Sequence, residues 1–300
     1  MRPAASLLLP RSRQEQCNRR KSAGPCHRTR ANTLEQALES KAVIVEPVVP
    51  GCIHNQLHVH DNLPWTFQEV FAGGKQLTSS MRRSKSWIVN VPIDCHSLGS
   101  YRRDMDLLRE EVMEELLRKA RRPHRYWHLG IPCDSFSIAN VNMNQGTRTR
   151  DLPEGDDSLP REILGNELLA RSIRIIETLE EAGNYWSIEN PQSSYLFRQV
   201  SVERLKEQAS CHEAVFDQSM HGLKFPDSGV DVFCRKSTRV ISNLLHLVGL
   251  VKRCSRTHSH EHALGSVWTP HGWQRRTKLA GRYPVQLCRK WAELATLIQN

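Results

Sequence analysis

The sequence lacks the features that mark two large classes of protein. None of its apolar stretches approaches the roughly 18 residues that a membrane-spanning helix requires, so we expect no membrane partner. The leucines at positions 7–9 are too few to form the hydrophobic part of a secretory signal, so secretion is not expected either. No internal repeat is visible in the 300 residues. The length is sufficient for one large α/β domain or two small ones with a sizeable core.

Cysteines are present but form no regular framework. The nine cysteines are an odd number, and no two of them make a Cys-x-x-Cys pair. This pattern argues against a disulfide scaffold and favours reduced thiols in an intracellular protein.

Acidic residues are scarce in the N-terminal segment. Residues 1–31 contain eight Lys or Arg residues but a single acid, Glu15, so they hold most of the net charge of +10. Residues 1–60 also lack hydrophobic periodicity, apart from the short run 42–49. We interpret residues 1–60 as a basic, largely disordered tail; an arm that binds nucleic acid and a targeting peptide stay open as alternatives.

Residues 61–300 alternate between short apolar segments and amphipathic stretches. In Asp106–Arg122 the apolar residues recur with helical period, and the last turn is basic. Alternating strands and helices predict an α/β domain with a mostly parallel sheet and helices on both faces, as in a Rossmann-like fold. Strands are expected at Thr66–Phe71, Ile88–Ile93, Tyr126–Leu129 and Tyr185–Ile188, helices at Leu77–Arg83, Asp106–Arg122 and Arg161–Ala182, and a polar loop at Asn140–Pro160.

Four segments that contain chemically useful groups follow the expected strands. In an open parallel sheet, ligands bind outside the carboxyl ends of the strands, so these segments should share one edge. Each has an ordinary explanation when taken alone: a tight turn, a surface carboxylate or a cysteine buried as a small apolar residue. The four are Phe71-Ala72-Gly73-Gly74, Asp94, Pro132-Cys133 and Glu189-Asn190-Pro191.

In their order along the chain, these segments resemble the motifs of the cytosine-C5 DNA methyltransferase family. The resemblance extends over roughly residues 65–300, and the chain is also similar to a divergent group of such domains found with mobile elements. Further segments that carry it are Asp104-Met105-Asp106-Leu107, Gly130-Ile131-Pro132-Cys133, Ile188-Glu189-Asn190, Phe216-Asp217-Gln218 with Gly222, Lys236-Ser237-Thr238-Arg239 and Gly281-Arg282-Tyr283-Pro284.

The resemblance implies a Rossmann-like methyltransferase domain over residues 61–300 that uses S-adenosyl-L-methionine. Cys133 would be the nucleophile that attacks C6 of cytosine, with Glu189 and Arg239 as the other catalytic residues. Loop 140–160 would close over the site and exclude water. The implied cofactor-binding residues are Phe71, Gly73, Gly74, Asp94, Asp106 and Pro132.

The implied partner is nucleic acid, with DNA favoured over RNA, and the implied compartment is the nucleus rather than the cytoplasm. Residues 240–280 leave room only for a reduced target-recognition region, which disfavours sequence-specific methylation of duplex DNA. Two other hypotheses stay open. The domain could be an inactive relic or nucleic-acid-binding module that keeps the fold, or a methyltransferase of Rossmann type with another substrate.

Two clusters near the C-terminus lie outside these motifs. Cys254, His258, His260 and His262 could hold zinc, because alternating histidines on a strand share a face, but their spacing matches no standard zinc motif. A polar, partly exposed segment is the favoured explanation, so we assign no metal from the sequence and keep zinc as the lesser alternative. The side chains of the second cluster could stack on nucleic-acid bases or could simply pack within the fold. It consists of Trp268, Trp273 and Tyr283 near Arg275, Arg276 and Lys278.

Overall fold

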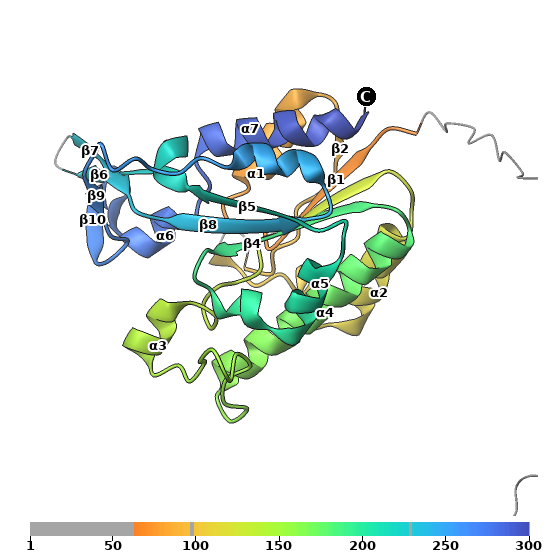
Figure 1. Ribbon diagram of the computed structural model, residues 1–300, viewed down its shortest axis with the longest axis horizontal. Helices are drawn as coiled ribbons and strands as arrows, with labels where there is room; N and C mark the ends of the chain where they lie inside the picture. Colours follow the sequence, from red (N-terminus) through yellow and green to blue (C-terminus); the bar gives the residue numbers. More distant parts are fainter. Residues whose placement is uncertain (1–62, 97–98, 228–229, 300) are drawn as a thin grey trace, which may run out of the picture. The chain divides into compact units, whose positions relative to one another are not determined.

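A computed structural model of the protein describes residues 63–96, 99–227 and 230–299 (Figure 1). The expected N-terminal tail, residues 1–60, lies outside the described residues. Within them, no helix is both long enough and apolar enough to cross a membrane.

The core of the domain is a six-stranded mixed sheet with the order β2-β1-β3-β4-β8-β5. The strands β2, β1, β3 and β4 run parallel to one another, whereas β8 runs antiparallel to both β4 and β5. The expected parallel order therefore holds for the first four strands, and the sheet as a whole is mixed. The bounds are β1 Thr66–Val70, β2 Ile88–Val89, β3 Arg125–Leu129, β4 Tyr185–Pro191, β5 His212–Asp217 and β8 Ser237–Ser242.

Helices cover both faces of this sheet, as expected (Figure 1). On one face lie α1, Gln76–Ser84, and α7, Val285–Thr296, which pack on each other. On the other face lie α2, Glu110–Ala120, α4, Pro160–Glu181, and α5, Val200–Glu207. The protein is thus a mixed α/β structure with a three-layer arrangement.

Side-chain alternation along the strands divides the core into two clusters. On β3, the buried Tyr126 packs with the α1 and α7 side, and its neighbour Trp127 packs with the α2 and α4 side. Successive side chains of a strand point to opposite faces, so a strand buried on both faces reads as a continuous apolar run. The short apolar segments of the sequence have this form because helices cover both of their faces.

Local sequence signals explain the helix ends. The first turn of α2 contains Glu110 and Glu111 and its last turn contains Arg118 and Lys119, an order that favours the helix dipole. Pro160 begins α4 at a position where its missing N–H costs no hydrogen bond.

Three expected elements differ in extent from those in the structure. The strand expected at 88–93 is reduced to β2, with Ile93 joined to Val70 by an isolated bridge. The helix expected from Asp106 starts at Glu110, because the Asp106 carboxylate accepts the backbone N–H of Leu108 in a turn before the helix. The loop expected at 140–160 begins as helix α3, Ile138–Asn144.

Two stretches of the chain after β5, on either side of β8, form a smaller unit beside the main sheet (Figure 1). Its strands make a three-stranded sheet of order β6-β7-β9 and a separate β10-β11 hairpin. The bounds are β6 Lys224–Asp227, β7 Val230–Cys234, β9 His260–Glu261, β10 Ser266–Thr269, β11 Gly272–Arg275 and α6 Arg276–Ala280; the 3-10 helices are η2 Arg103–Met105, η3 Tyr195–Arg198, η4 Gln218–His221, η5 Leu245–Leu250 and η6 Leu297–Gln299.

Candidate functional site

A pocket of about 220 Å³ lies at the carboxyl ends of β1, β3 and β4. At β1 the strand order changes direction, since β2 lies on one side and β3 on the other. The helix after β1 covers one face of the sheet and α2, which follows β2, covers the opposite face. Such a switch point opens a crevice where α/β proteins bind ligands. This switch-point pocket is lined by residues 71–74 and 130–134 and by Gln76, Glu189, Pro191, Lys236, Gly281 and Tyr283.

The turn between β1 and α1 forms one wall of this pocket. Phe71, Gly73 and Lys75 all have positive φ angles, of 58°, 45° and 59°. The left-handed conformation is costly for the two non-glycine residues, and such strain is often found at ligand sites. Asp94 supports the turn, because its Oδ2 accepts the backbone N–H of Gly73 at 2.8 Å. Asp94 therefore holds the wall from behind and does not itself line the pocket.

The segment Gly130–Cys133 forms the opposite wall. A Cβ atom on Gly130 would come within 3.3 Å of both the Phe71 carbonyl oxygen and the Tyr283 hydroxyl, so glycine permits this close approach. Asn190 donates a hydrogen bond of 2.7 Å from Nδ2 to the carbonyl of Ile131, which joins the ends of β3 and β4. Cys133, at the end of this wall, is half-buried.

The electrostatic surroundings of Cys133 keep its thiol protonated at neutral pH. Its pKa is raised to about 11, chiefly by burial and also by the negative charges of Glu189 and Asp134, against the lowering effect of Lys236. A thiolate rather than a thiol is the nucleophile. Cys133 therefore requires a change in its surroundings, such as an approach of Lys236 or the loss of nearby negative charge, before it can attack.

Glu189 lies on β4 and lines the pocket, and within the described part of the chain only one of its two carboxylate oxygens is hydrogen-bonded. Tyr283 donates a hydrogen bond of 3.0 Å to Oε2. The other oxygen, Oε1, is buried without a hydrogen-bond partner among the described residues, although the ammonium of Lys236 lies 3.9 Å away. Buried polar atoms are nearly always hydrogen-bonded in proteins, so an unsatisfied oxygen in a pocket indicates a place for a ligand donor.

A chain of buried hydrogen bonds fixes Tyr283 from behind. His128 Nε2 lies 3.0 Å from the Tyr283 hydroxyl, and His128 Nδ1 lies 2.9 Å from Ser187 Oγ. Ser187 also contacts the hydroxyl of Tyr126, which accepts a hydrogen bond from Trp291. Burial lowers the pKa of His128 to about 3, so the ring is neutral and can both donate and accept.

Two residues expected at the site lie elsewhere. Arg239 pairs with Glu213 at 3.5 Å, and its guanidinium lies 5.0 Å from the centre of the Phe197 ring. Asp106 accepts a hydrogen bond of 2.6 Å from the Tyr101 hydroxyl. Neither is among the residues that line the switch-point pocket. Of the expected residues, Phe71, Gly73, Gly74, Pro132, Cys133 and Glu189 do line it.

Lys236 and Tyr283 are pocket residues that the sequence did not identify as such. Both belong to segments that carry the family resemblance. In the segment that contains Lys236, however, the resemblance pointed to Arg239 as the acting residue. Lys236 immediately precedes β8, and its ammonium also donates to the carbonyl of Ala280 at 3.1 Å. Its position at the start of a strand antiparallel to β4 brings it to the carboxyl end of that strand, beside Glu189.

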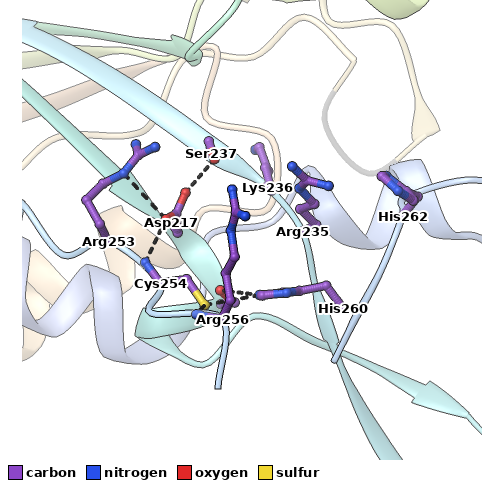
Figure 2. A pocket seen from close by; sticks show the side chains of 10 residues that line it. Asp217, Arg235, Lys236, Ser237, Arg253, Cys254, Arg256, His260 and His262 are labelled. Carbon is purple, nitrogen blue, oxygen red and sulfur yellow. Dashed lines mark hydrogen bonds and ion pairs between the residues drawn. The ribbon is translucent and has the colours of Figure 1, made fainter. Parts of the chain in front are cut away.

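A second, basic pocket of about 440 Å³ adjoins this site and shares Lys236 with it (Figure 2). Lys236, Arg235, Arg253 and Arg256 line it, against a single acid, Asp217. Its charge suits an anion such as a phosphate group. The side chains of Cys254 and His260 also line this pocket, as does His262.

The β10–β11 hairpin presents two tryptophans to solvent. Trp268 and Trp273 face each other across the hairpin with ring centroids 5.8 Å apart, and they are 62% and 72% exposed. Tyr283, which the sequence grouped with them, lies instead in the hydrogen-bonded chain behind Glu189. The three aromatic residues therefore do not form one surface.

No protein-family model matches the chain, and no curated protein matches it either. A fold of this class supports many unrelated activities, so an activity has to be argued from the pocket residues and their chemistry. The residues that bear on it are Cys133, Glu189, Lys236 and Tyr283, together with the glycine turn 71–74.

Proposed function

We propose that the protein is an S-adenosylmethionine-dependent methyltransferase of Rossmann-like fold that methylates C5 of cytosine in nucleic acid through a covalent bond to Cys133. One observation carries this proposal. Cys133 and Glu189 line the same pocket at the switch point of the sheet, and Glu189 presents an oxygen that lacks a hydrogen-bond partner among the described residues. A nucleophile and an oriented acceptor on one pocket suit attack on a heterocyclic ring.

The residues around the glycine turn fit the proposed cofactor. Gln76 contributes a buried carboxamide oxygen without a hydrogen-bond partner, which would accept a hydroxyl or ammonium group. A Cβ on Gly73 would meet no atom within 4 Å, so the turn is open to a ligand there. The pocket volume of about 220 Å³ is below the roughly 300 Å³ at which small-molecule sites usually begin. The exposed turn therefore has to move outward when cofactor and base are both bound.

In this proposal the protein side chains perform the acid–base and binding steps. The Cys133 thiol loses its proton, and its sulfur forms a bond to C6 of the base, which makes C5 electron-rich. Glu189, oriented by Tyr283, accepts a hydrogen bond at Oε1 from the exocyclic amino group of the cytosine, and Lys236 favours the thiolate. S-adenosylmethionine supplies the electrophilic methyl group when it is bound. Water accepts both the proton that the thiol loses at the start and the later C5 proton. The electrons of the C5–H bond re-form the C5–C6 double bond as the sulfur–carbon bond breaks, which restores the thiolate.

Nucleic acid is the partner that the surroundings of the pocket favour, with DNA preferred to RNA because of the family resemblance. A base in a duplex must leave its stack to reach such a pocket. Arg235, Arg253 and Arg256 would hold the flanking phosphates in the basic pocket. The exposed Trp268 and Trp273 would stack on bases, which is a sequence-tolerant contact.

A mechanism-based trap tests the covalent step. The full-length protein is incubated with S-adenosylmethionine and oligonucleotides that contain 5-fluorocytosine, as single- and double-stranded DNA and RNA. Fluorine cannot leave C5 as a cation, so the sulfur–carbon bond persists and gives an adduct in denaturing electrophoresis and mass spectrometry. Wild type and the control Cys211→Ser should form the adduct, whereas Cys133→Ser should not. Absence of an adduct with all four substrates would exclude the proposed methylation of cytosine.

The raised pKa of the Cys133 thiol favours a second candidate, a nucleic-acid-binding module that keeps the fold without turnover. Calorimetric titration with S-adenosylhomocysteine separates the candidates. Binding together with the adduct supports the enzyme. Binding without an adduct supports a methyltransferase with another substrate, and no binding at millimolar ligand leaves only the module.

A further inference from the structure

Three side chains from the C-terminal part of the chain converge on one point beside the basic pocket. Cys254 lies in the segment after η5, His258 lies four residues later, and His260 is in β9, where it pairs with Phe233 of β7. Cys254 Sγ is 3.6 Å from His258 Nε2 and 3.5 Å from His260 Nε2, and the two nitrogens are 3.0 Å apart. We call these three residues the Cys/His cluster.

Hydrogen bonding alone does not account for this convergence. The Nε2 atom of a histidine carries either one hydrogen or one lone pair in the ring plane, so it makes one good hydrogen bond. His260 Nε2 nevertheless contacts three polar atoms, which belong to Cys254, His258 and Ser219, the last at 3.2 Å. A point on which three lone pairs converge is the arrangement expected around a cation.

The distances match a tetrahedral zinc ion. With Zn–S near 2.3 Å and Zn–N near 2.05 Å, tetrahedral geometry places sulfur and nitrogen about 3.5 Å apart and two nitrogens about 3.3 Å apart. The sulfur–nitrogen distances of 3.5 and 3.6 Å agree with these values, and the nitrogen–nitrogen distance of 3.0 Å is slightly shorter. One thiolate with two imidazoles is a donor set that suits zinc and copper, and the near-tetrahedral spacing of the three atoms favours zinc.

Surrounding groups hold the three ligand side chains in place. The backbone N–H of Arg256 donates to Cys254 Sγ at 3.3 Å, made possible by the left-handed φ of 63° at Arg256. The N–H of Cys254 in turn donates to Asp217 Oδ2 at 2.8 Å, and the His258 ring packs on Phe233. Backbone donors to sulfur and rigid packing of imidazoles are the outer-shell features that orient metal ligands.

We propose that Cys254, His258 and His260 bind one Zn²⁺ ion whose fourth position faces the basic pocket. Cys254, His260 and the neighbouring Ser219 all line that pocket (Figure 2). His262 points away from the cluster in the same view, so it is not a ligand, although the sequence placed it with the other three. Three protein ligands and one open position are typical of zinc sites that bind water or a further ligand.

The charge of the pocket identifies the class of that further ligand. A zinc ion with one thiolate retains a positive charge, and Arg235, Lys236 and Arg256 add to it. The one acid, Asp217, already pairs with Arg253 at 3.5 Å and accepts from Cys254. An anionic oxygen, such as that of a phosphate group, therefore suits the fourth position, with water there when no anion is bound.

Metal analysis of the intact protein tests the site directly. The full-length chain is purified without chelators from zinc-supplemented medium, and bound metal is measured by plasma mass spectrometry. Wild type and the control His262→Asn should hold about one zinc per chain, whereas Cys254→Ser and His258→Gln should hold at least about tenfold less. X-ray absorption of the wild type should give one sulfur and two imidazole nitrogens. That last measurement needs no variant, so it decides the question even where a substitution prevents folding.

Cobalt substitution tests both the thiolate and the open position. The Co²⁺ protein should show a thiolate-to-metal charge-transfer band that is kept in Cys211→Ser and lost in Cys254→Ser. Added inorganic phosphate should shift its visible bands, and less so in Arg256→Ala. Wild type without bound zinc, protein ligands other than one sulfur and two imidazole nitrogens, or a charge-transfer band that survives in folded Cys254→Ser would each overturn the site. A spectrum insensitive to excess phosphate would overturn the open position.

Discussion

Tyr283 donates its hydroxyl hydrogen to Oε2 of Glu189 at 3.0 Å, although 94 residues separate the two in the chain. The same hydroxyl lies 3.0 Å from His128 Nε2. One oxygen thus joins the C-terminal segment to two neighbouring strands, whereas Oε1 of Glu189 is buried without a hydrogen-bond partner among the described residues.

Replacement of Tyr283 by phenylalanine should loosen this arrangement with little change in packing. Two buried groups, the Glu189 carboxylate and His128 Nε2, lose a partner, so the free energy of unfolding should fall by about 1–3 kcal/mol. Urea denaturation followed by circular dichroism measures the change, with Tyr195→Phe as a control of equal chemistry. If Glu189 acts in the proposed reaction, adduct formation with the 5-fluorocytosine substrate should also slow in Tyr283→Phe. An unchanged denaturation midpoint would show that the hydroxyl does not hold Glu189.

Glu69 should make the protein less stable as the pH rises from 4.5 to 7. The pKa of this carboxyl is raised to about 7, chiefly by burial and also by Asp94, against two hydrogen bonds from Thr78 and the charge of Lys75. Between these pH values the unfolded chain has released the proton and the folded chain still holds it. Stability from this group is therefore complete below pH 4.5 and is lost by about pH 7, to the extent of roughly 3 kcal/mol.

The variant Glu69→Gln isolates this contribution. Its amide remains neutral at every pH and can still accept from Thr78, so the unfolding free energy should depend less on pH between 4.5 and 7 than in wild type. Other titrating groups contribute equally to both proteins, so the difference between the two pH profiles reports Glu69 alone. Parallel profiles for wild type and variant would contradict a raised pKa at Glu69.

The Cys133 thiol should react slowly with alkylating reagents. With a pKa of about 11, about one molecule in a thousand carries the thiolate at pH 8. Asp134→Asn removes one of the charges that raise this pKa and should accelerate alkylation by about twofold to fivefold. Lys236→Met should slow it, since Lys236 lowers the pKa. Iodoacetamide labelling of the Cys133 peptide, followed by mass spectrometry against pH, measures these rates. Fast wild-type labelling at pH 7 would exclude the raised pKa.

The sequence was sufficient to predict the elements whose signals are local. The amphipathic helices near 110–120 and 160–181 follow from apolar periodicity and from charged or proline residues at their ends. The four strands that begin the sheet follow from short apolar runs between those helices. Their carboxyl ends meet at one edge, which is why Cys133 and Glu189 could be placed together before the structure was known.

Strand direction and distant partners could not be predicted in this way. Nothing in the alternating pattern of Ser237–Ser242 states that this strand runs antiparallel between β4 and β5, yet this direction brings Lys236 beside Glu189. Likewise, His260 meets Cys254 only because β9 pairs with β7, and His262 then points elsewhere. Such contacts depend on tertiary packing, which local propensity does not encode.

The segment expected to close over the site as a mobile loop also illustrates this limit, because a buried arginine holds it in place. Arg148 is fully buried, and its guanidinium donates to the carbonyls of Ser135, Pro153 and Glu162 while lying 4.1 Å from the centre of the Phe136 ring. An arginine in a polar stretch is usually exposed, so the buried position of Arg148 could not be predicted from the residues around it.

Removal of this guanidinium should therefore destabilise the protein strongly. Arg148→Ala removes one donor from each of three buried carbonyls and leaves a space beside Phe136, so the free energy of unfolding should fall by about 3 kcal/mol. Arg148→Lys keeps the charge but lacks the planar fork that reaches several acceptors, so it should recover only part of the loss. Arg150→Ala, two residues further in the exposed part of the loop, is the matched control and should change stability by less than about 0.5 kcal/mol. Guanidinium denaturation measures the three values, and limited proteolysis should cleave residues 145–159 faster in Arg148→Ala than in the control. Equal stability of Arg148→Ala and Arg150→Ala would show that the segment is held by other contacts.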